Sequence, residues 1–399
     1  MSTSDHSARR VANQLLLSCL LPDAAGRESW ADLTARPLDW DFIVSVAETQ
    51  GVFPALCHRL QQADSSQVPA SVIEPLRQRY SAIARRNLRL TAELVRIAGA
   101  FESGGIRVLA YKGPALAASL HGNVALREFS DLDFIVSLGD FPRVKQIVAS
   151  LGYQPLFALS AKQEASLLRT ECQLDFVNAA GDLVDVHWQL VPHHLPPEFS
   201  FEAWWARRAS IALAGREFAI FSPEDMVLAL AVHASKHLWT RLSWLWDVAE
   251  SIRVRPQLNW DSLLASARAA HALRALLATL AIVHELLGVA VPDSVLLSAS
   301  DHHAAGEIAM RFCRDFLEGT PDARGSGQRW INMLRLSDGW NDRLRSAGRY
   351  LLASGVEEWA MCNLPDSLFG LYPLVRIARL AGLRPSAASL RRIRRAPDN

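Results

Sequence analysis

The chain has 399 residues, with 42 Lys and Arg against 41 Asp and Glu, and half of its residues are hydrophobic. This composition excludes a largely disordered protein, and the length is sufficient for two or three domains. A net charge of +1 argues against general nucleic-acid binding through whole-surface electrostatics. The five cysteines are scattered without a Cys-x-x-Cys pair, which is typical of a reducing compartment and indicates neither a disulfide framework nor a cysteine zinc site.

The N-terminal segment faintly resembles a lipoprotein signal, because Arg9-Arg10 precedes an apolar stretch that ends at Cys19. Asn13 and Gln14 interrupt that stretch, so an amphipathic first helix is the preferred interpretation. No apolar run reaches the roughly 20 residues that a membrane-spanning helix needs. We therefore expect a cytoplasmic enzyme or adaptor.

Residues 1–104 are predicted to be a helical N-terminal region. Asp39 is a plausible N-cap for a helix that Gly51 ends, and residues 69–100 carry apolar side chains at helical spacing. Residues 193–399 are predicted to form a helical C-terminal region.

Between these regions, residues 105–192 change to β-prone runs alternating with short helices. A four-residue, glycine-containing connection between the last two runs predicts a β-hairpin. The expected fold class is therefore α+β, a small mixed β-sheet core flanked by helical regions. In chain order the expected elements are strand 106–111, helix 115–121, strand 131–136, helix 141–151, strand 172–178 and strand 183–190.

An acidic group is the strongest chemical signal in the core. Asp131 and Asp133 are two residues apart on a predicted strand, so both carboxylates point to one face with their Cα atoms ~6.6 Å apart. Asp185 lies on the last predicted strand and is the natural third ligand, with His187 on the same face as a secondary candidate. Three carboxylates on adjacent strands can hold two Mg²⁺ or Mn²⁺ ions ~3.5–4 Å apart, an arrangement suited to displacement at phosphorus.

A glycine turn precedes this group. A strand running into Lys112-Gly113-Pro114 and then a helix creates a helix N-terminus, where phosphate groups bind. Gly113 permits close approach of the backbone, and Lys112 supplies a cation for a triphosphate. Arg127 is a further candidate for a phosphate or for the carboxylates, with structural pairing as the alternative.

Together these motifs resemble the DNA polymerase beta-like nucleotidyltransferase superfamily. They are most similar to one branch, an uncharacterised bacterial nucleotidyltransferase family with a Lys-Gly-Pro turn. The resemblance covers residues 38–255. The stretches that carry it are Leu109–Leu116, Leu126–Asp133 and Val184–Trp188, with Leu38-Asp39-Trp40, Pro223-Glu224-Asp225 and His233–His237 as further landmarks.

By that resemblance, Asp131 and Asp133 bind the metals, and Asp185 completes the site and activates an acceptor hydroxyl. The implied reaction is attack on the α-phosphate of an NTP, transfer of the nucleoside monophosphate and release of pyrophosphate. The acceptor is not implied and could be a small molecule, a peptide or a protein. Better-studied members of the superfamily have Gly-Ser or Gly-Gly in the turn, so a non-catalytic nucleotide-binding or adaptor protein is the alternative, with a metal-dependent phosphohydrolase as a third, weaker hypothesis.

Two further features have competing interpretations. His233 and His237 are four residues apart on a predicted helix and could share a zinc ion, although a polar packing face is favoured. The C-terminal end carries seven arginines, Arg376, Arg379, Arg384, Arg391, Arg392, Arg394 and Arg395, among apolar residues. This pattern allows peripheral contact with an anionic membrane, while an amphipathic closing helix with a frayed tail is favoured.

Overall fold

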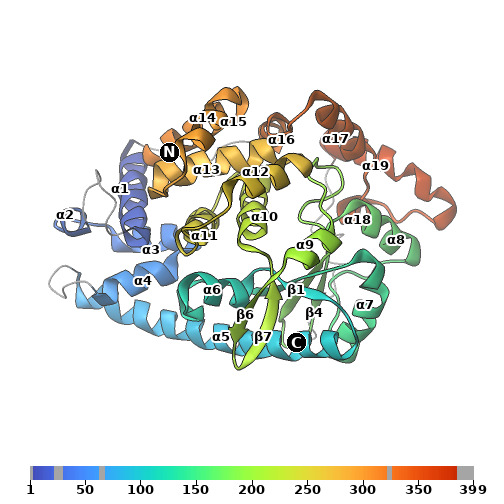
Figure 1. Ribbon diagram of the computed structural model, residues 1–399, viewed down its shortest axis with the longest axis horizontal. Helices are drawn as coiled ribbons and strands as arrows, with labels where there is room; N and C mark the ends of the chain where they lie inside the picture. Colours follow the sequence, from blue (N-terminus) through green and yellow to red (C-terminus); the bar gives the residue numbers. More distant parts are fainter. Residues whose placement is uncertain (1–2, 22–29, 63–67, 321–325, 384–399) are drawn as a thin grey trace. The chain divides into compact units, whose positions relative to one another are not determined.

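The computed structural model describes residues 3–21, 30–62, 68–320 and 326–383. The chain forms two compact units, each made of separate stretches of sequence. Unit 1 is Met1–Glu93, Gly113–Phe129 and Ser222–Asp338, and unit 2 is Leu94–Lys112, Ser130–Phe221 and Gly339–Asn399. The long helix α5 (Ala70–Ser103), light blue in Figure 1, runs from the first unit into the second. The domain boundaries expected at 104/105 and 192/193 stay a prediction.

Unit 1 is built from helices. Its central helix, α13, is apolar along most of its length and packs against α10, α11 and α15. The predicted cap at Asp39 is confirmed, because its side chain accepts a hydrogen bond from the Phe42 backbone N–H at the start of α3. Besides the first part of α5, the unit contains α1 (Thr3–Leu20), α2 (Trp30–Thr34), α3 (Trp40–Thr49), α4 (Phe53–Gln62), α6 (Gly113–His121), η1 (Val124–Leu126), α10 (Pro223–Lys236), α11 (Leu242–Arg253), α12 (Trp260–Ala269), α13 (Leu273–Leu287), α14 (Asp293–Asp301), α15 (His303–Leu317) and α16 (Ser326–Arg335).

Unit 2 contains a five-stranded sheet with the order β1-β2-β5-β4-β3. The pair β2–β5 is parallel and the other pairs are antiparallel, so the sheet is mixed and the fold is α+β, as predicted. The strands are β1 (Val108–Ala110), β2 (Asp131–Val136), β3 (Gln154–Pro155), β4 (Gln173–Val177) and β5 (Leu183–His187). The remaining elements of the unit are η2 (Leu138–Asp140), α7 (Phe141–Ser150), α8 (Ala161–Thr170), α9 (Phe201–Arg207), β6 (Ala209–Leu213), β7 (Arg216–Ile220), α17 (Trp340–Leu352), α18 (Val356–Met361), η3 (Asp366–Leu371) and α19 (Tyr372–Leu380).

The two faces of this sheet have different chemistry, because side chains alternate along each strand. On one face, Leu132 and Phe134 of β2 are fully buried, and the ring of Phe134 meets Phe101 of α5 edge-on at 5.4 Å. Val184 and Val186 of β5 stand opposite these residues and are also fully buried. The polar residues of the same strands consequently lie on the face opposite α5.

The strand predictions in the core are confirmed for β2, whose bounds match those expected, and for the β4–β5 hairpin. One further hairpin, β6–β7, lies inside the region that the sequence predicts to be helical. Its turn is Ala214-Gly215, and both residues have positive φ, of 52° and 77°. Such a two-residue turn matches the twist of antiparallel strands, and this local geometry favours strands over a helix there.

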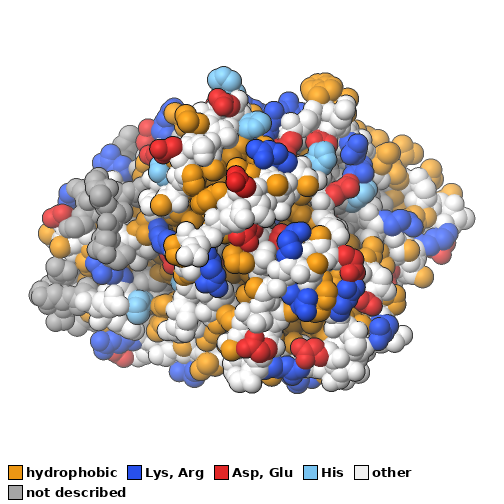
Figure 2. Space-filling view, in the orientation of Figure 1, with side chains coloured by type: hydrophobic (Ala, Val, Ile, Leu, Met, Phe, Trp, Pro, Cys, Tyr) orange, Lys and Arg blue, Asp and Glu red, His pale blue; other side chains and the backbone are white. Residues whose placement is uncertain are grey.

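The visible face of the protein carries basic and acidic side chains interspersed with each other (Figure 2). Of the C-terminal arginines, the structure describes Arg376 and Arg379, and both form ion pairs with Glu358. Arg384, Arg391, Arg392, Arg394 and Arg395 lie outside the described residues, and membrane contact by this end stays a prediction. Within the described part of the chain, no helix is long and apolar enough to cross a membrane.

Candidate functional site

Three aspartates stand side by side across the sheet of unit 2. Asp133 of β2 is paired in register with Asp185 of β5, and Asp185 is paired with Asp175 of β4. Residues directly opposite each other on neighbouring strands have side chains on the same face, so the three carboxylates form one row. Asp131 precedes Asp133 by two residues and therefore shares this face.

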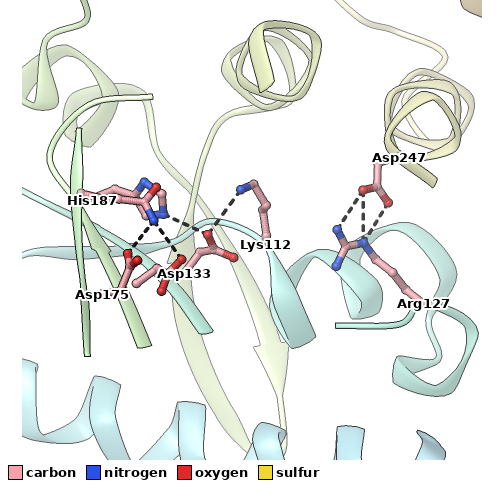
Figure 3. Close-up of polar contacts among 8 residues, drawn as sticks. Lys112, Arg127, Asp133, Asp175, His187 and Asp247 are labelled. Carbon is pink, nitrogen blue, oxygen red and sulfur yellow. Dashed lines mark hydrogen bonds and ion pairs between the residues drawn. The ribbon is translucent and has the colours of Figure 1, made fainter. Parts of the chain in front are cut away.

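Asp133 is the most buried member of the row, with 4% of its side chain exposed. Its Oδ1 atom lies 3.3 Å from Nζ of Lys112 and 2.9 Å from Nε2 of His187, and Figure 3 shows both side chains pointing toward it. Burial by itself would raise the pKa of this carboxyl group. Lys112 and His187 outweigh burial and lower the pKa of Asp133 below its usual range, so the group is ionised.

Asp185 has the opposite environment. Its Oδ2 atom accepts a hydrogen bond of 3.0 Å from Nε2 of Gln173, a neutral donor. Burial, followed by the charges of Asp175, Asp133 and Asp131, raises the pKa of Asp185 to about 9. Burial therefore disfavours the ionised form of Asp185, and the neighbouring carboxylates add to this effect.

Part of this face has a donor set that suits a metal ion. Asp133, Asp185 and His187 each offer one ligand atom, and these atoms lie within 4.8 Å of one another. Carboxylate oxygens suit Mg²⁺ and Mn²⁺, and an imidazole nitrogen is also a common ligand of Mn²⁺ and later transition metals. Asp131 is half-buried on the same face, outside this close group, and its role as a metal ligand stays a prediction.

Lys112 reaches the row because the chain continues the β1–β2 pairing one residue beyond β1. The Tyr111 N–H donates to the Asp133 carbonyl oxygen at 3.1 Å, and Nζ of Lys112 lies 4.6 Å from the centre of the Tyr111 ring. Gly113 follows directly and begins α6 with φ of +55°, a left-handed conformation that favours glycine. The expected helix after the turn is confirmed, and Gly113 belongs to unit 1.

Arg127 also belongs to unit 1, where it forms a buried ion pair with Asp247 of α11. Its Nε lies 2.9 Å from Oδ1, and its Nη2 lies 2.9 Å from Oδ2, in a two-pronged contact (Figure 3). The sequence left a phosphate or carboxylate contact and a structural ion pair open for Arg127, and the contact with Asp247 is a structural ion pair. Contact between Arg127 and a nucleotide stays a prediction.

The sequence prediction missed Asp175 and Gln173 as site residues. Gln173 donates to Oδ1 of Asp175 at 2.7 Å as well as to Asp185, so both residues belong to the polar row. A signal was present, because Gln173 and Asp175 alternate with the buried residues Leu174 and Phe176 along a correctly predicted strand. Alternation could have placed them on one face, whereas their position beside Asp185 depends on the hairpin register.

The histidines of α10 lie in an aromatic cluster. The ring centres of His233 and His237 are 4.9 Å apart, and the Trp244 ring is 5.1 Å from the first and 4.9 Å from the second. This arrangement agrees with the packing interpretation. Within the described residues, the group of three potential metal ligands is the one at Asp133, Asp185 and His187.

The chain is similar to several solved structures at low sequence identity. Among solved structures, the chain is similar to the solution structure of the antibiotic-resistance factor ANT(2'')-Ia, at 14% identity and a TM-score of 0.34 over 46% of this chain and 91% of that chain. It is also similar to the crystal structure of ANT(2'')-Ia with adenylyl-2''-tobramycin, at 16% identity and a TM-score of 0.30 over 45% of this chain and 96% of that chain. A third structure, an antigenic nucleotidyltransferase-like protein from Paracoccidioides brasiliensis, shares 13% identity at a TM-score of 0.28, with 53% of this chain and 93% of that chain covered.

No curated protein matches the chain. A family model described as an uncharacterised nucleotidyltransferase matches residues 36–288, which is more than half of the sequence and includes the whole polar row. The chain therefore belongs to this uncharacterised nucleotidyltransferase family.

Proposed function

We propose that this protein is a metal-dependent nucleotidyltransferase that transfers a nucleoside monophosphate from an NTP to an acceptor and releases pyrophosphate. The observation that carries the proposal is the convergence of Asp133, Asp185 and His187 on one face of the sheet, with ligand atoms within 4.8 Å of one another. Membership of a nucleotidyltransferase family supports the same reaction class.

The residues of the row fit a divalent cation. Burial raises the pKa of Asp185 most and the adjacent carboxylates raise it further, and a bound cation would favour the ionised form that can act as a ligand. Asp133 and Asp185 would hold the ion, with His187 as a further donor and Asp131 as a further predicted ligand. A bound Mg²⁺ or Mn²⁺ supplies charge neutralisation on the phosphate oxygens during displacement at phosphorus.

The other steps use side chains of the chain itself. Asp185 would accept the proton of the acceptor hydroxyl as the oxygen forms a bond to the α-phosphorus, and the bond from that phosphorus to the leaving pyrophosphate breaks. Lys112, with its ammonium group beside Asp133, would attract the negative charge of the triphosphate. The predicted nucleotide contacts of Gly113 and Arg127 stay sequence predictions. The acceptor would be a small molecule, a peptide or a protein.

The test is transfer of radiolabel from each α-labelled NTP to a panel of acceptors, with pyrophosphate release measured alongside. We expect Asp133→Asn to lower turnover by more than about 100-fold, because loss even of a side chain that only orients a metal ligand costs roughly 10–100-fold in affinity. Asp140→Asn is the matched control, since Asp140 lies in unit 2 at η2 and pairs with Arg143.

Unchanged turnover in Asp133→Asn would contradict the proposal. NTP binding without pyrophosphate release from the wild-type protein would support the adaptor alternative. Product formation that needs no acceptor would support the phosphohydrolase alternative.

A further inference from the structure

We propose that Gln173 is a positioning residue that clamps Asp185 in its ligand orientation, and that Asp175 anchors this clamp. The inference deepens the proposed function and rests on it, because the position of Asp185 matters only where that carboxylate binds a cation. Asp175 does not belong to the close group of potential metal ligands, and Gln173 meets the row through its Nε2 donor.

The clamp uses the full donor capacity of one side-chain amide. A glutamine NH₂ group has two N–H donors. One Nε2 contact reaches Oδ1 of Asp175 at 2.7 Å, and the other reaches Oδ2 of Asp185 at 3.0 Å. Because Oδ2 of Asp185 is held, rotation of the carboxylate is restrained and the direction of its other oxygen is set as well.

The strand register explains why residue 173 can do this. Gln173 is paired with His187, and Asp175 is paired with Asp185, so all four side chains share one face of the β4–β5 hairpin. The amide therefore spans two carboxylates that stand directly opposite each other on neighbouring strands, where like charges repel. Without the bridging donor, that repulsion would turn the two carboxylates apart.

The neutrality of glutamine is essential to this role. A Lys or Arg at the same place would also bridge the carboxylates, but its positive charge would offset their negative charge and repel a divalent cation. An amide donates hydrogen bonds without removing the charge that attracts the metal. Gln173 therefore fixes the orientation of the carboxylates without neutralising the negative charge that attracts the cation.

Gln189 offers a matched control. It is a half-buried glutamine in the same unit that also makes two hydrogen bonds, at 2.8 and 3.2 Å, to the backbone of Phe199. Replacing either glutamine with Leu removes two hydrogen bonds from unit 2. Only Gln173→Leu removes them from the row of carboxylates.

The experiment measures Mn²⁺ binding by the electron paramagnetic resonance signal of the free ion, together with the thermal unfolding midpoint in EDTA. We expect Gln173→Leu to raise the Kd for Mn²⁺ about 10–100-fold, the usual cost of losing a residue that orients a metal ligand. Gln189→Leu should bind Mn²⁺ as the wild-type protein does. In transfer assays, Gln173→Leu should need more Mn²⁺ for half-maximal rate.

Gln173→Lys separates positioning from a general structural role. Its ammonium group can donate to both carboxylates, so the unfolding midpoint in EDTA should be equal to or above that of the wild-type protein, while Mn²⁺ binding is weakened. Equal Mn²⁺ affinity in Gln173→Leu and wild type would overturn the inference and leave the proposed function intact. Equal weakening in the Gln173→Leu and Gln189→Leu variants would also overturn it. A wild-type protein that binds no Mn²⁺ and transfers no nucleotide would remove the proposed function and this inference together.

Discussion

Asp133 and Asp185 are neighbours in the sheet, yet their surroundings drive their pKa values in opposite directions. Asp133 has the ammonium group of Lys112 and the imidazole of His187 against it, and its pKa is lowered. Burial and adjacent carboxylates raise the pKa of Asp185 to about 9. Lys112 therefore acts as an internal counter-ion at the place where a metal cation would also bind.

At the residue scale, Lys112→Met should have opposite effects on metal binding and on catalysis. The ammonium group lies 3.3 Å from Oδ1 of Asp133 and competes with a cation for that carboxylate. Its removal should tighten Mn²⁺ binding by a factor on the order of 10, and turnover should fall because the triphosphate loses a cationic contact. Titration with Mn²⁺ and measurement of pyrophosphate release check both effects.

Lys145→Met is the control for this prediction. Lys145 also forms an ion pair in unit 2, with Glu164 at 2.5 Å, but it contacts no member of the carboxylate row in the hydrogen bonds and ion pairs described. Weaker Mn²⁺ binding in Lys112→Met would contradict the counter-ion interpretation.

At the scale of elements, the ion pair between Arg127 and Asp247 ties the segment after η1 to α11 within unit 1. Both side chains are buried, at 9% and 1% exposure. Removal of one partner from such a pair leaves a buried charge without compensation, whereas removal of both leaves none. We therefore expect the loss of one partner alone to be strongly destabilising, and the loss of both partners together to be much less so.

We expect Arg127→Met to lower the free energy of unfolding of unit 1 by about 3–5 kcal/mol, and the double variant Arg127→Met/Asp247→Leu to recover most of that loss. Urea unfolding of the two single variants and the double variant measures the coupling. If the loss in free energy of unfolding of the double variant equals the sum of the losses of the two single variants, the two side chains are not coupled. A folded double variant also allows a direct measurement of NTP affinity, which tests the predicted phosphate contact of Arg127.

The strands of unit 2 show which structural features the sequence pattern predicts and which it does not. The first part of Asp131–Val136 alternates between polar and apolar residues, and the strand is bounded as predicted. The β4–β5 hairpin was predicted from its glycine-containing connection, but the pairing of Asp175 with Asp185 depends on register. A shift of one residue in the pairing register would move Asp175 to the other face of the sheet. The positions of Asp175 and Gln173 beside Asp185 could therefore not be predicted from the sequence.

At the scale of the whole molecule, each unit is assembled from three stretches of sequence that are far apart along the chain. The cysteines are distributed over both units. Cys57 is buried, and burial raises its pKa to about 12, whereas Cys362 is exposed. These thiols can therefore report on opening of the folded chain.

We expect iodoacetamide at pH 8 to modify Cys362 and to leave Cys57 intact in the native protein, because the reactive species is the thiolate. The raised pKa of Cys57 in the folded state also makes the free energy of unfolding depend on pH. The contribution of Cys57 to stability is fully present below the thiol's pKa in the unfolded state, about 8.5, and is lost as pH rises toward 12. Mass spectrometry of labelled peptides measures the extent of modification at each cysteine, with urea-unfolded protein as the control in which both cysteines react. Modification of native Cys57 at the rate of Cys362 would contradict the expectation.

The sequence by itself determined the strand that carries Asp131 and Asp133, the later strand with Asp185, the helix after the Lys112 turn and the family resemblance. Each of these depends on residues close together in the chain, where alternation, capping and turn chemistry act locally. Only the tertiary structure decided that Lys112 and His187 converge on Asp133, that Gln173 and Asp175 stand beside Asp185, and that Arg127 pairs with Asp247. These residues are from 10 to 120 positions apart in the sequence, and their contacts depend on strand register and helix packing, which no local pattern specifies.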